Sequence, residues 1–316
     1  NLAGTDDLPL LQQSGAEGVG LLRSEFLYLG RSSYPTEDEL FASYRQLVQA
    51  MDGREIIIRT LDIGGDKEVP ALDLEKEQNP FLGYRAIRIC LTREDVFKTQ
   101  LRALYRASAF GNVGVMFPMV TGPAELAQLK AALRDAEDTL CARGERFGRY
   151  QTGVMIETPA AAVLSDLLAR EADFFSIGTN DLIHYIMGID RNNRHVAYLN
   201  EPLHPAIVRS LKHIIDAAHR EGIGVSVCGE LASDPFGLAL LLGMGVDTVS
   251  AAPRFVPGMK HLIRQFNAQT CMDLANSVLL STDVAASKRM VREALQQSLG
   301  QELAFHTTSL FTYSHP

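Results

Sequence analysis

The stretch that decides the fold is residues 153–181, which includes GVMIETP (153–159) and FFSIGTND (174–181). In both segments a short apolar run typical of a buried strand is followed at once by a carboxylate, Glu157 or Asp181, and then by residues that often begin a helix. A carboxylate at the mouth of a buried strand is costly unless it is paired or bound to a metal. We therefore expect two neighbouring parallel strands whose carboxyl ends bring these side chains together.

The alternation of short apolar runs with longer amphipathic stretches extends over most of the chain. Strands are predicted at residues 18–22, 56–62, 85–89, 113–120, 153–157, 174–178, 224–228 and 248–251. Helices are predicted at residues 93–109, 124–143, 160–170 and 205–221. This order builds either a closed barrel or an open, doubly wound sheet.

Polar residues at the strand ends favour the barrel. In a (β/α)8 barrel the chemistry gathers where strands end, and the polar residues in such positions are Arg23, Arg59, Glu157, Asn180, Asp181, Cys228 and Glu230. A Gly-x-Gly-x-x-Gly sequence at a strand–helix turn, typical of the open dinucleotide-binding sheet, does not occur. We predict a (β/α)8 barrel at residues 16–264, followed at 265–316 by a closing helix, expected at 283–297, and a tail.

Composition excludes several classes of protein. The 316 residues are 46% hydrophobic and 22% charged, as in a globular protein, and the formal net charge of -8 disfavours nucleic-acid binding. The most apolar run, residues 238–246, is too short to span a membrane. Four cysteines without a C-x-x-C pair favour a reducing cytoplasm over a disulfide framework. Because the chain begins with Asn1, we expect it to be part of a longer protein.

Glu157 and Asp181 are candidate metal ligands. Oxygen ligands on rigid strand ends suit Mg²⁺, which keeps several waters and takes other ligands from its substrate. The alternative is that each carboxylate caps the helix that follows it. Two carboxylates by themselves leave both interpretations open.

Four arginines are candidate anion ligands: Arg23, Arg59, Arg85 and Arg191. The planar guanidinium group matches phosphate and carboxylate oxygens and stays charged at any relevant pH. Each arginine alone is more often a salt-bridge partner. Together, and facing two carboxylates, they predict a site for an anion and a metal.

Cys228 closes the predicted strand in GVSVCGEL. A buried cysteine is usually an inert apolar residue, but a thiol above a planar substrate could give a proton to carbon, provided that its pKa is not strongly lowered. Lys67, in the glycine-rich loop GGDK, and Glu230 are predicted to support the site.

Several longer segments carry a family resemblance: GLLRSEFLYL (20–29), RTLDIGGDK (59–67), NPFLGYRAIRI (79–89), GVMIETPAAA (153–162), DFFSIGTNDL (173–182) and VCGELASD (227–234). They resemble Enzyme I of the phosphoenolpyruvate:sugar phosphotransferase system, in order from about Gly15 to Arg264. Pyruvate phosphate dikinase and phosphoenolpyruvate synthase share the same barrel with looser motifs. Residues 1–15 resemble the end of the linker helix that joins this barrel to a preceding domain.

The resemblance implies a role for each matching residue. Arg23, Arg59 and Arg191 would bind the phosphoryl group of phosphoenolpyruvate, Arg85 would help to hold the substrate, and Asn180 would contact phosphoryl oxygens. Glu157 and Asp181 would hold Mg²⁺. Cys228 would protonate the enolate to give pyruvate.

The resemblance also implies partners. The phosphoryl acceptor would be a histidine on a separate amino-terminal domain, which is expected to pass the group to the histidine phosphocarrier protein; no Gly-Gly-x-Thr-Ser-His stretch occurs in this chain. A homodimer is expected, without nucleic-acid or membrane partners. Alternatives are a nitrogen-related regulatory paralogue, a fragment of a dikinase or synthase, and a Mg²⁺-dependent aldolase or lyase, which would need neither Cys228 nor several phosphate-binding arginines.

Overall fold

Parallel strands form the centre of the molecule in the computed structural model, which describes residues 1–64, 69–72, 74–190 and 192–299. Seven strands are hydrogen-bonded in chain order within the described residues, and every neighbouring pair runs parallel. They are β1 (Val19–Arg23), β2 (Ile56–Arg59), β3 (Val113–Phe117), β4 (Tyr150–Ile156), β5 (Phe174–Ile177), β6 (Gly224–Val227) and β7 (Thr248–Val249).

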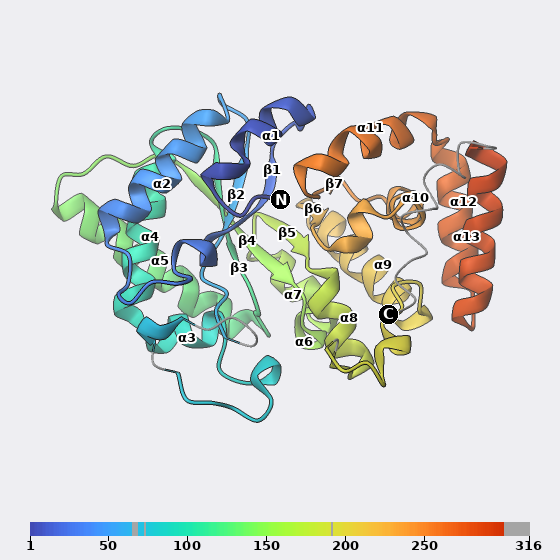
Figure 1. The fold of residues 1–316 in the computed structure, drawn as a ribbon, viewed down its shortest axis with the longest axis horizontal. Coiled ribbons are helices and arrows are strands. Elements are labelled where there is room, and N and C mark those ends of the chain that lie inside the picture. Colours follow the sequence, from blue (N-terminus) through green and yellow to red (C-terminus); the bar gives the residue numbers. More distant parts are fainter. Residues whose placement is uncertain (65–68, 73, 191, 300–316) are drawn as a thin grey trace.

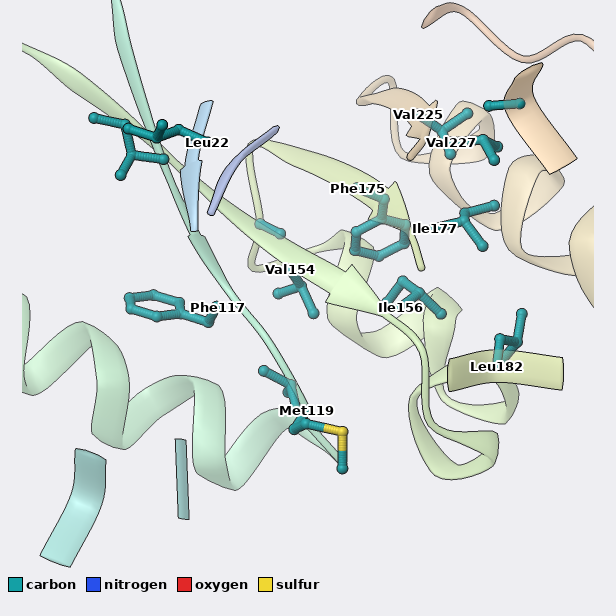
Figure 2. Packing of buried hydrophobic residues seen from close by; sticks show 14 of the residues in the cluster. Leu22, Phe117, Met119, Val154, Ile156, Phe175, Ile177, Leu182, Val225 and Val227 are labelled. Carbon is teal, nitrogen blue, oxygen red and sulfur yellow. The ribbon is translucent and has the colours of Figure 1, made fainter. Parts of the chain in front are cut away.

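The strands alternate between two hydrophobic clusters, because successive side chains of a strand point to opposite faces. Val154, Ile156, Phe175 and Ile177 belong to the large cluster between strands and helices, and Figure 2 shows them close together. The alternate residues form a small separate cluster: Leu21, Ile57, Met116, Met155, Phe174 and Cys228. We place this second cluster inside the barrel, where the inward side chains of six successive strand segments meet.

Helices surround the strands, as a sheet with two buried faces requires. Figure 1 shows α2, α4 and α5 on one side of the strands, and α9, α10, α12 and α13 on the other. The α-helices are α1 (Leu8–Ser14), α2 (Glu37–Ala50), α3 (Ile87–Thr92), α4 (Glu94–Ser108), α5 (Pro123–Ala142), α6 (Pro159–Val163), α7 (Ser165–Ala169), α8 (Thr179–Met187), α9 (Pro205–Arg220), α10 (Pro235–Met244), α11 (Val256–Gln265), α12 (Ala268–Leu279) and α13 (Val284–Leu299). The short 3-10 helices are η1 (Thr5–Asp7), η2 (Ser24–Leu27), η3 (Pro70–Leu72), η4 (Pro80–Leu82), η5 (Ala197–Leu199), η6 (Glu230–Ser233) and η7 (Pro253–Phe255).

The first two residues bridge the gap between β1 and β7. Leu2 pairs in parallel with Leu22 of β1 and exchanges backbone hydrogen bonds with that strand, at 2.8 and 3.0 Å. On the other side, the Asn1 ammonium group donates to the carbonyl of Ala251 at 2.6 Å, and the Ser250 hydroxyl donates to Asn1 Oδ1 at 2.5 Å. The amino-terminal segment thus lies where an eighth strand would close the barrel.

The predicted barrel of parallel strands is confirmed, but the predicted strand at 85–89 is wrong. Residues Ile87–Thr92 form helix α3, which turns Ile87, Ile89 and Cys90 into the core. An apolar run of this length fits a buried helix as well as a strand, and only its packing distinguishes them. The eighth place in the barrel belongs to Leu2.

Most predicted helices are confirmed within one or two residues. The helix expected at 160–170 is instead two short helices, α6 and α7, which meet at Leu164. The helix expected at 283–297 is α13, and α12 precedes it against α10. Among the helices of the described residues, none combines the length and the apolar character that crossing a membrane requires.

Candidate functional site

The carboxyl ends of the strands bring the predicted site residues to one rim of the barrel. Arg23 and Arg59 are the last residues of β1 and β2, which pair in register at these positions. Glu157 directly follows β4, and Cys228 directly follows β6. Arg59, Glu157 and Cys228 lie two residues beyond Ile57, Met155 and Ser226, so strand alternation directs them toward the barrel axis.

Arg59 is buried between two carboxylates. Its Nη2 lies 2.6 Å from Glu25 Oε1 and its Nη1 lies 3.0 Å from Asp62 Oδ2. Burial alone would lower the pKa of Arg59, but Asp62 and Glu25 outweigh that effect and raise it. The guanidinium group therefore stays charged.

Arg85 is a second buried guanidinium group at the same rim. It lies 3.0 Å from Asp62 Oδ1 and 3.3 Å from Asp181 Oδ2, and its Nη1 donates to the Tyr185 hydroxyl at 2.9 Å. The preceding loop presses against it, since a Cβ at Gly64 would come within 2.6 Å of Arg85 Cβ and φ there is +99°. Asp62 thus joins the two arginines, and Arg85 joins Asp62 to Asp181.

Each of these arginines keeps one unused donor. The Nε atoms of Arg59 and Arg85 are buried, and neither has a hydrogen-bond partner among the residues that the structure describes. A buried N–H group without an acceptor is unfavourable. A bound anion is one acceptor that could satisfy them.

Glu157 is almost completely buried and accepts a 2.7 Å hydrogen bond from the backbone N–H of Met119. Burial, followed by repulsion from Asp181 and Asp62, raises the pKa of Glu157 to about 8, although Arg59 and Arg85 act in the opposite direction. Glu157 follows β4 and Asp181 follows the neighbouring strand β5, so the two carboxylates lie at the same part of the rim. A cation held between them would remove that repulsion.

The helix-cap alternative does not explain Glu157. Helix α6 is capped by Thr158, whose hydroxyl accepts from the Ala161 N–H at 3.1 Å. Asp181 lies in the first turn of α8, where a negative charge is favourable, but its carboxylate is directed to Arg85. Both carboxylates therefore face the rim.

Two oxygen-bearing side chains suit Mg²⁺, which commonly takes one or two carboxylates from a protein. A closed protein cage is absent from the part of the chain that the structure describes, since no group of three or more His, Cys, Asp or Glu residues there could hold a metal. The donor set thus fits a metal that completes its shell with water and substrate.

Cys228 belongs to the inner cluster, and its thiol lies 3.6 Å from the carbonyl oxygen of Ile177. Burial raises the pKa of the Cys228 thiol above its ordinary value. The backbone is fixed as well, because Asn1 Nδ2 donates to the Cys228 carbonyl at 2.9 Å. The cysteine is therefore a protonated thiol at the rim, as a proton donor must be.

Asn180 and Glu230 connect α8 to the loop after β6. The Glu230 N–H donates to Asn180 Oδ1 at 3.2 Å, while the Glu230 side chain is exposed. The two segments approach so closely that a Cβ at Gly229 would lie 1.8 Å from Thr179 Oγ1.

Arg23 is exposed at the end of β1, and its guanidinium carbon lies 5.0 Å from the centre of the Phe26 ring. Lys67 and Arg191 lie outside the described residues.

Sequence reasoning missed Glu25 and Tyr185. Glu25 is completely buried and anchors Arg59, and Tyr185 joins Arg85 to the loop before it by donating to the Phe81 carbonyl. A carboxylate two residues after the strand-end Arg23 was a usable signal for Glu25. Tyr185 lies one turn after Asp181 on α8, and nothing in its sequence neighbourhood distinguishes it from a packing residue.

A parallel barrel with buried arginines, carboxylates and a thiol at its carboxyl rim defines a class, that of α/β-barrel proteins whose site suits an anion together with a metal. The chain belongs to the family of PEP-utilising enzymes, because the model of their PEP-binding domain matches residues 1–268. That match includes residues 1–15, whose first two residues bridge β1 and β7.

Three curated relatives carry the name phosphoenolpyruvate-protein phosphotransferase. The proteins from Bacillus sp. (strain S) and Geobacillus stearothermophilus are 49% and 52% identical over 88% and 83% of this chain, and 48% and 46% of their own lengths. The protein from Haemophilus influenzae is 47% identical over 94% of this chain and 52% of its own length. The chain spans about half the length of these relatives.

The fold has a more distant likeness. A crystal structure described as a citrate lyase from Burkholderia xenovorans covers 94% of this chain and 88% of its own, with a TM-score of 0.54 and 15% identity. At this identity the likeness shows the fold alone.

Proposed function

We propose that this chain is the phosphoenolpyruvate-binding part of a phosphoenolpyruvate-protein phosphotransferase. The observation that carries the proposal is the pair of buried guanidinium groups, each with an unused Nε–H donor, at the rim of a PEP-utilising barrel. Phosphoenolpyruvate offers a phosphate and a carboxylate, two groups that match the guanidinium fork. The names of the relatives favour transfer to a protein acceptor over the dikinase and synthase alternatives.

In the proposed reaction, the phosphoryl group leaves phosphoenolpyruvate for a histidine on a separate amino-terminal domain. Arg59 and Arg85 stabilise the negative charge on the transferring group. Arg23 and Arg191 assist them, Asn180 contacts phosphoryl oxygens, and Lys67 and Glu230 are in support. The O–P bond of phosphoenolpyruvate breaks as a P–N bond forms to the histidine, and the enolate of pyruvate is left. Cys228 gives its proton to carbon 3 of the enolate, and the thiolate then takes a proton from water.

Mg²⁺ is proposed as the cofactor, with Glu157 and Asp181 as its protein ligands. When bound, it would neutralise charge on the phosphate and carboxylate oxygens. The support for this assignment is geometric: Glu157 directly follows β4, and Asp181 lies in the first turn of α8 after the neighbouring strand β5.

Further parts of the proposal rest on the resemblance to Enzyme I. The phosphohistidine would pass its group to the histidine phosphocarrier protein at the start of sugar uptake, and the barrel would form a homodimer. A cytoplasmic location is supported by four cysteines that form no disulfide. Sedimentation of the purified chain tests the dimer.

Calorimetric titration with phosphoenolpyruvate tests the binding proposal. We expect binding in the presence of Mg²⁺ and a loss of most of the affinity in EDTA. Glu157→Gln should reproduce that loss in the presence of Mg²⁺. Equal affinity with and without the metal would contradict the assignment of Glu157 and Asp181 as its ligands.

A further inference from the structure

Gln100, on helix α4, is a completely buried amide outside the rim. Its Oε1 accepts a hydrogen bond from the Leu61 N–H at 3.0 Å. Its Nε2 donates to Ser24 Oγ at 2.9 Å and to the Tyr44 hydroxyl at 3.0 Å. An uncharged amide with its oxygen and both its hydrogens engaged is a rigid connection, because breaking any of these bonds leaves a buried polar group unsatisfied.

Two of the three partners belong to the loops that hold Arg59. Ser24 directly precedes Glu25, and Leu61 directly precedes Asp62. These two carboxylates lie 2.6 and 3.0 Å from the Arg59 guanidinium nitrogens. The loops after β1 and β2 are therefore joined twice, at the rim through Arg59 and behind the rim through Gln100.

These two connections between the loops fix the orientation of the Arg59 guanidinium group. The Arg59 side chain ends between Glu25 and Asp62, so the relative position of these carboxylates sets the plane of the guanidinium fork. Gln100 sets that relative position from behind, through the residue next to each carboxylate. A fork that binds two oxygens tolerates little rotation.

We propose that Gln100 is a positioning residue that orients Arg59 for binding the phosphoryl group of phosphoenolpyruvate. This inference rests on the proposed function and deepens it. Gln100 itself contacts neither the substrate nor the reacting atoms. Its effect on binding is transmitted through Arg59.

A double-mutant cycle tests this coupling. Gln100→Leu keeps a side chain of similar size but removes all three hydrogen bonds. We expect it to weaken Mg²⁺-dependent phosphoenolpyruvate binding by about 10-fold, measured by calorimetry. In an Arg59→Lys background, which has already lost the fork, the same change should add less than about 2-fold.

Leu104→Ala is the matched control for stability, because Leu104 is a buried residue one turn further along α4 that takes no part in these hydrogen bonds. It should lower the thermal midpoint and leave phosphoenolpyruvate affinity within about 2-fold of the parent. Loss of affinity in this control equal to that in Gln100→Leu would overturn the inference. The inference would also be overturned if Gln100→Leu weakened phosphoenolpyruvate binding by the same factor in the parent and in the Arg59→Lys background.

A second pair of variants serves if Gln100→Leu does not fold. Ser24→Ala and Tyr44→Phe each remove one acceptor from Gln100 Nε2, but only Ser24 adjoins a carboxylate that holds Arg59. We expect Ser24→Ala to weaken binding by about 3-fold and Tyr44→Phe to weaken it less; equal effects on binding would contradict the inference. A parent chain that failed to bind phosphoenolpyruvate would overturn the proposed function, whereas normal affinity in Gln100→Leu would overturn only the role of Gln100.

Discussion

The pKa of the Glu157 carboxyl group depends strongly on the residues around it. It lies beside Asp181 and Asp62 in a buried setting, and its pKa is raised to about 8. In the unfolded chain it titrates near the ordinary value of 4.5. Between these two values the folded state binds more protons than the unfolded state, so the free energy of unfolding falls as the pH rises, by about 1 kcal/mol per pH unit.

Glu157→Gln should remove this part of the pH dependence, since an amide does not titrate. In EDTA, the thermal midpoint of the parent should fall relative to that of Glu157→Gln between about pH 5 and about pH 8. Added Mg²⁺ should reverse the difference, because it binds the ionised carboxylate. If the thermal midpoints of the two proteins changed with pH in parallel in EDTA, the pKa of Glu157 would not be raised in the folded state.

Cys228 is the residue at which binding and chemistry can be separated. Its thiol is buried with a raised pKa and donates to the carbonyl of Ile177. Cys228→Ala should keep phosphoenolpyruvate affinity within about 2-fold and reduce pyruvate formation by at least about 100-fold in a system that contains the histidine-bearing domain. Pyruvate formation at the parent rate would assign the proton to another donor.

At the scale of elements, residues Asn1 and Leu2 lie between β1 and β7 and complete the ring of strands. Leu2 is fully buried and pairs with β1, and Asn1 links β7 to the backbone of Cys228. Leu2 and Asn1 can complete the ring because β1 and β7, on either side of them, are already held by the rest of the sheet.

Leu2→Ala should therefore destabilise the barrel although it changes only the second residue. We expect a loss of about 2–5 kcal/mol in the free energy of unfolding, measured by urea denaturation, as for other buried leucines. Leu10→Ala is the matched control, because Leu10 on α1 is 54% exposed and should cost less than about 0.5 kcal/mol. Similar losses in both variants would mean that the segment does not close the barrel.

At the scale of the whole molecule, the chain corresponds to about half of its curated relatives. We expect the purified chain to bind phosphoenolpyruvate but to form no pyruvate in repeated turnovers, because the proposed acceptor histidine lies on another domain. Adding a separate domain that carries the proposed acceptor histidine should give about one pyruvate per added domain, measured by a coupled reduction assay. Sustained turnover without that domain would point to water or another residue of this chain as the acceptor.

The sequence by itself determined which segments are strands, with one exception, and which residues stand at their carboxyl ends. Local patterns carry this information, since a buried strand needs a short apolar run and the residue after it must lie at the rim. The assignment of Glu157, Asp181 and Cys228 to a common rim needed no more than that. The long motifs also indicated the family that the comparison with known proteins established.

Only the tertiary structure decided between alternative structures that the local sequence pattern fits equally well. Residues 85–89 fit a buried strand or a buried helix, and packing selected the helix, so that β2 pairs directly with β3. The ion pair of Arg59 with Glu25 joins residues 34 apart in the chain, and the hydrogen bond of Gln100 with Ser24 joins residues 76 apart. Contacts over such separations arise from the pairing of β1 with β2 and the packing of α4 behind them, which no short stretch of sequence encodes.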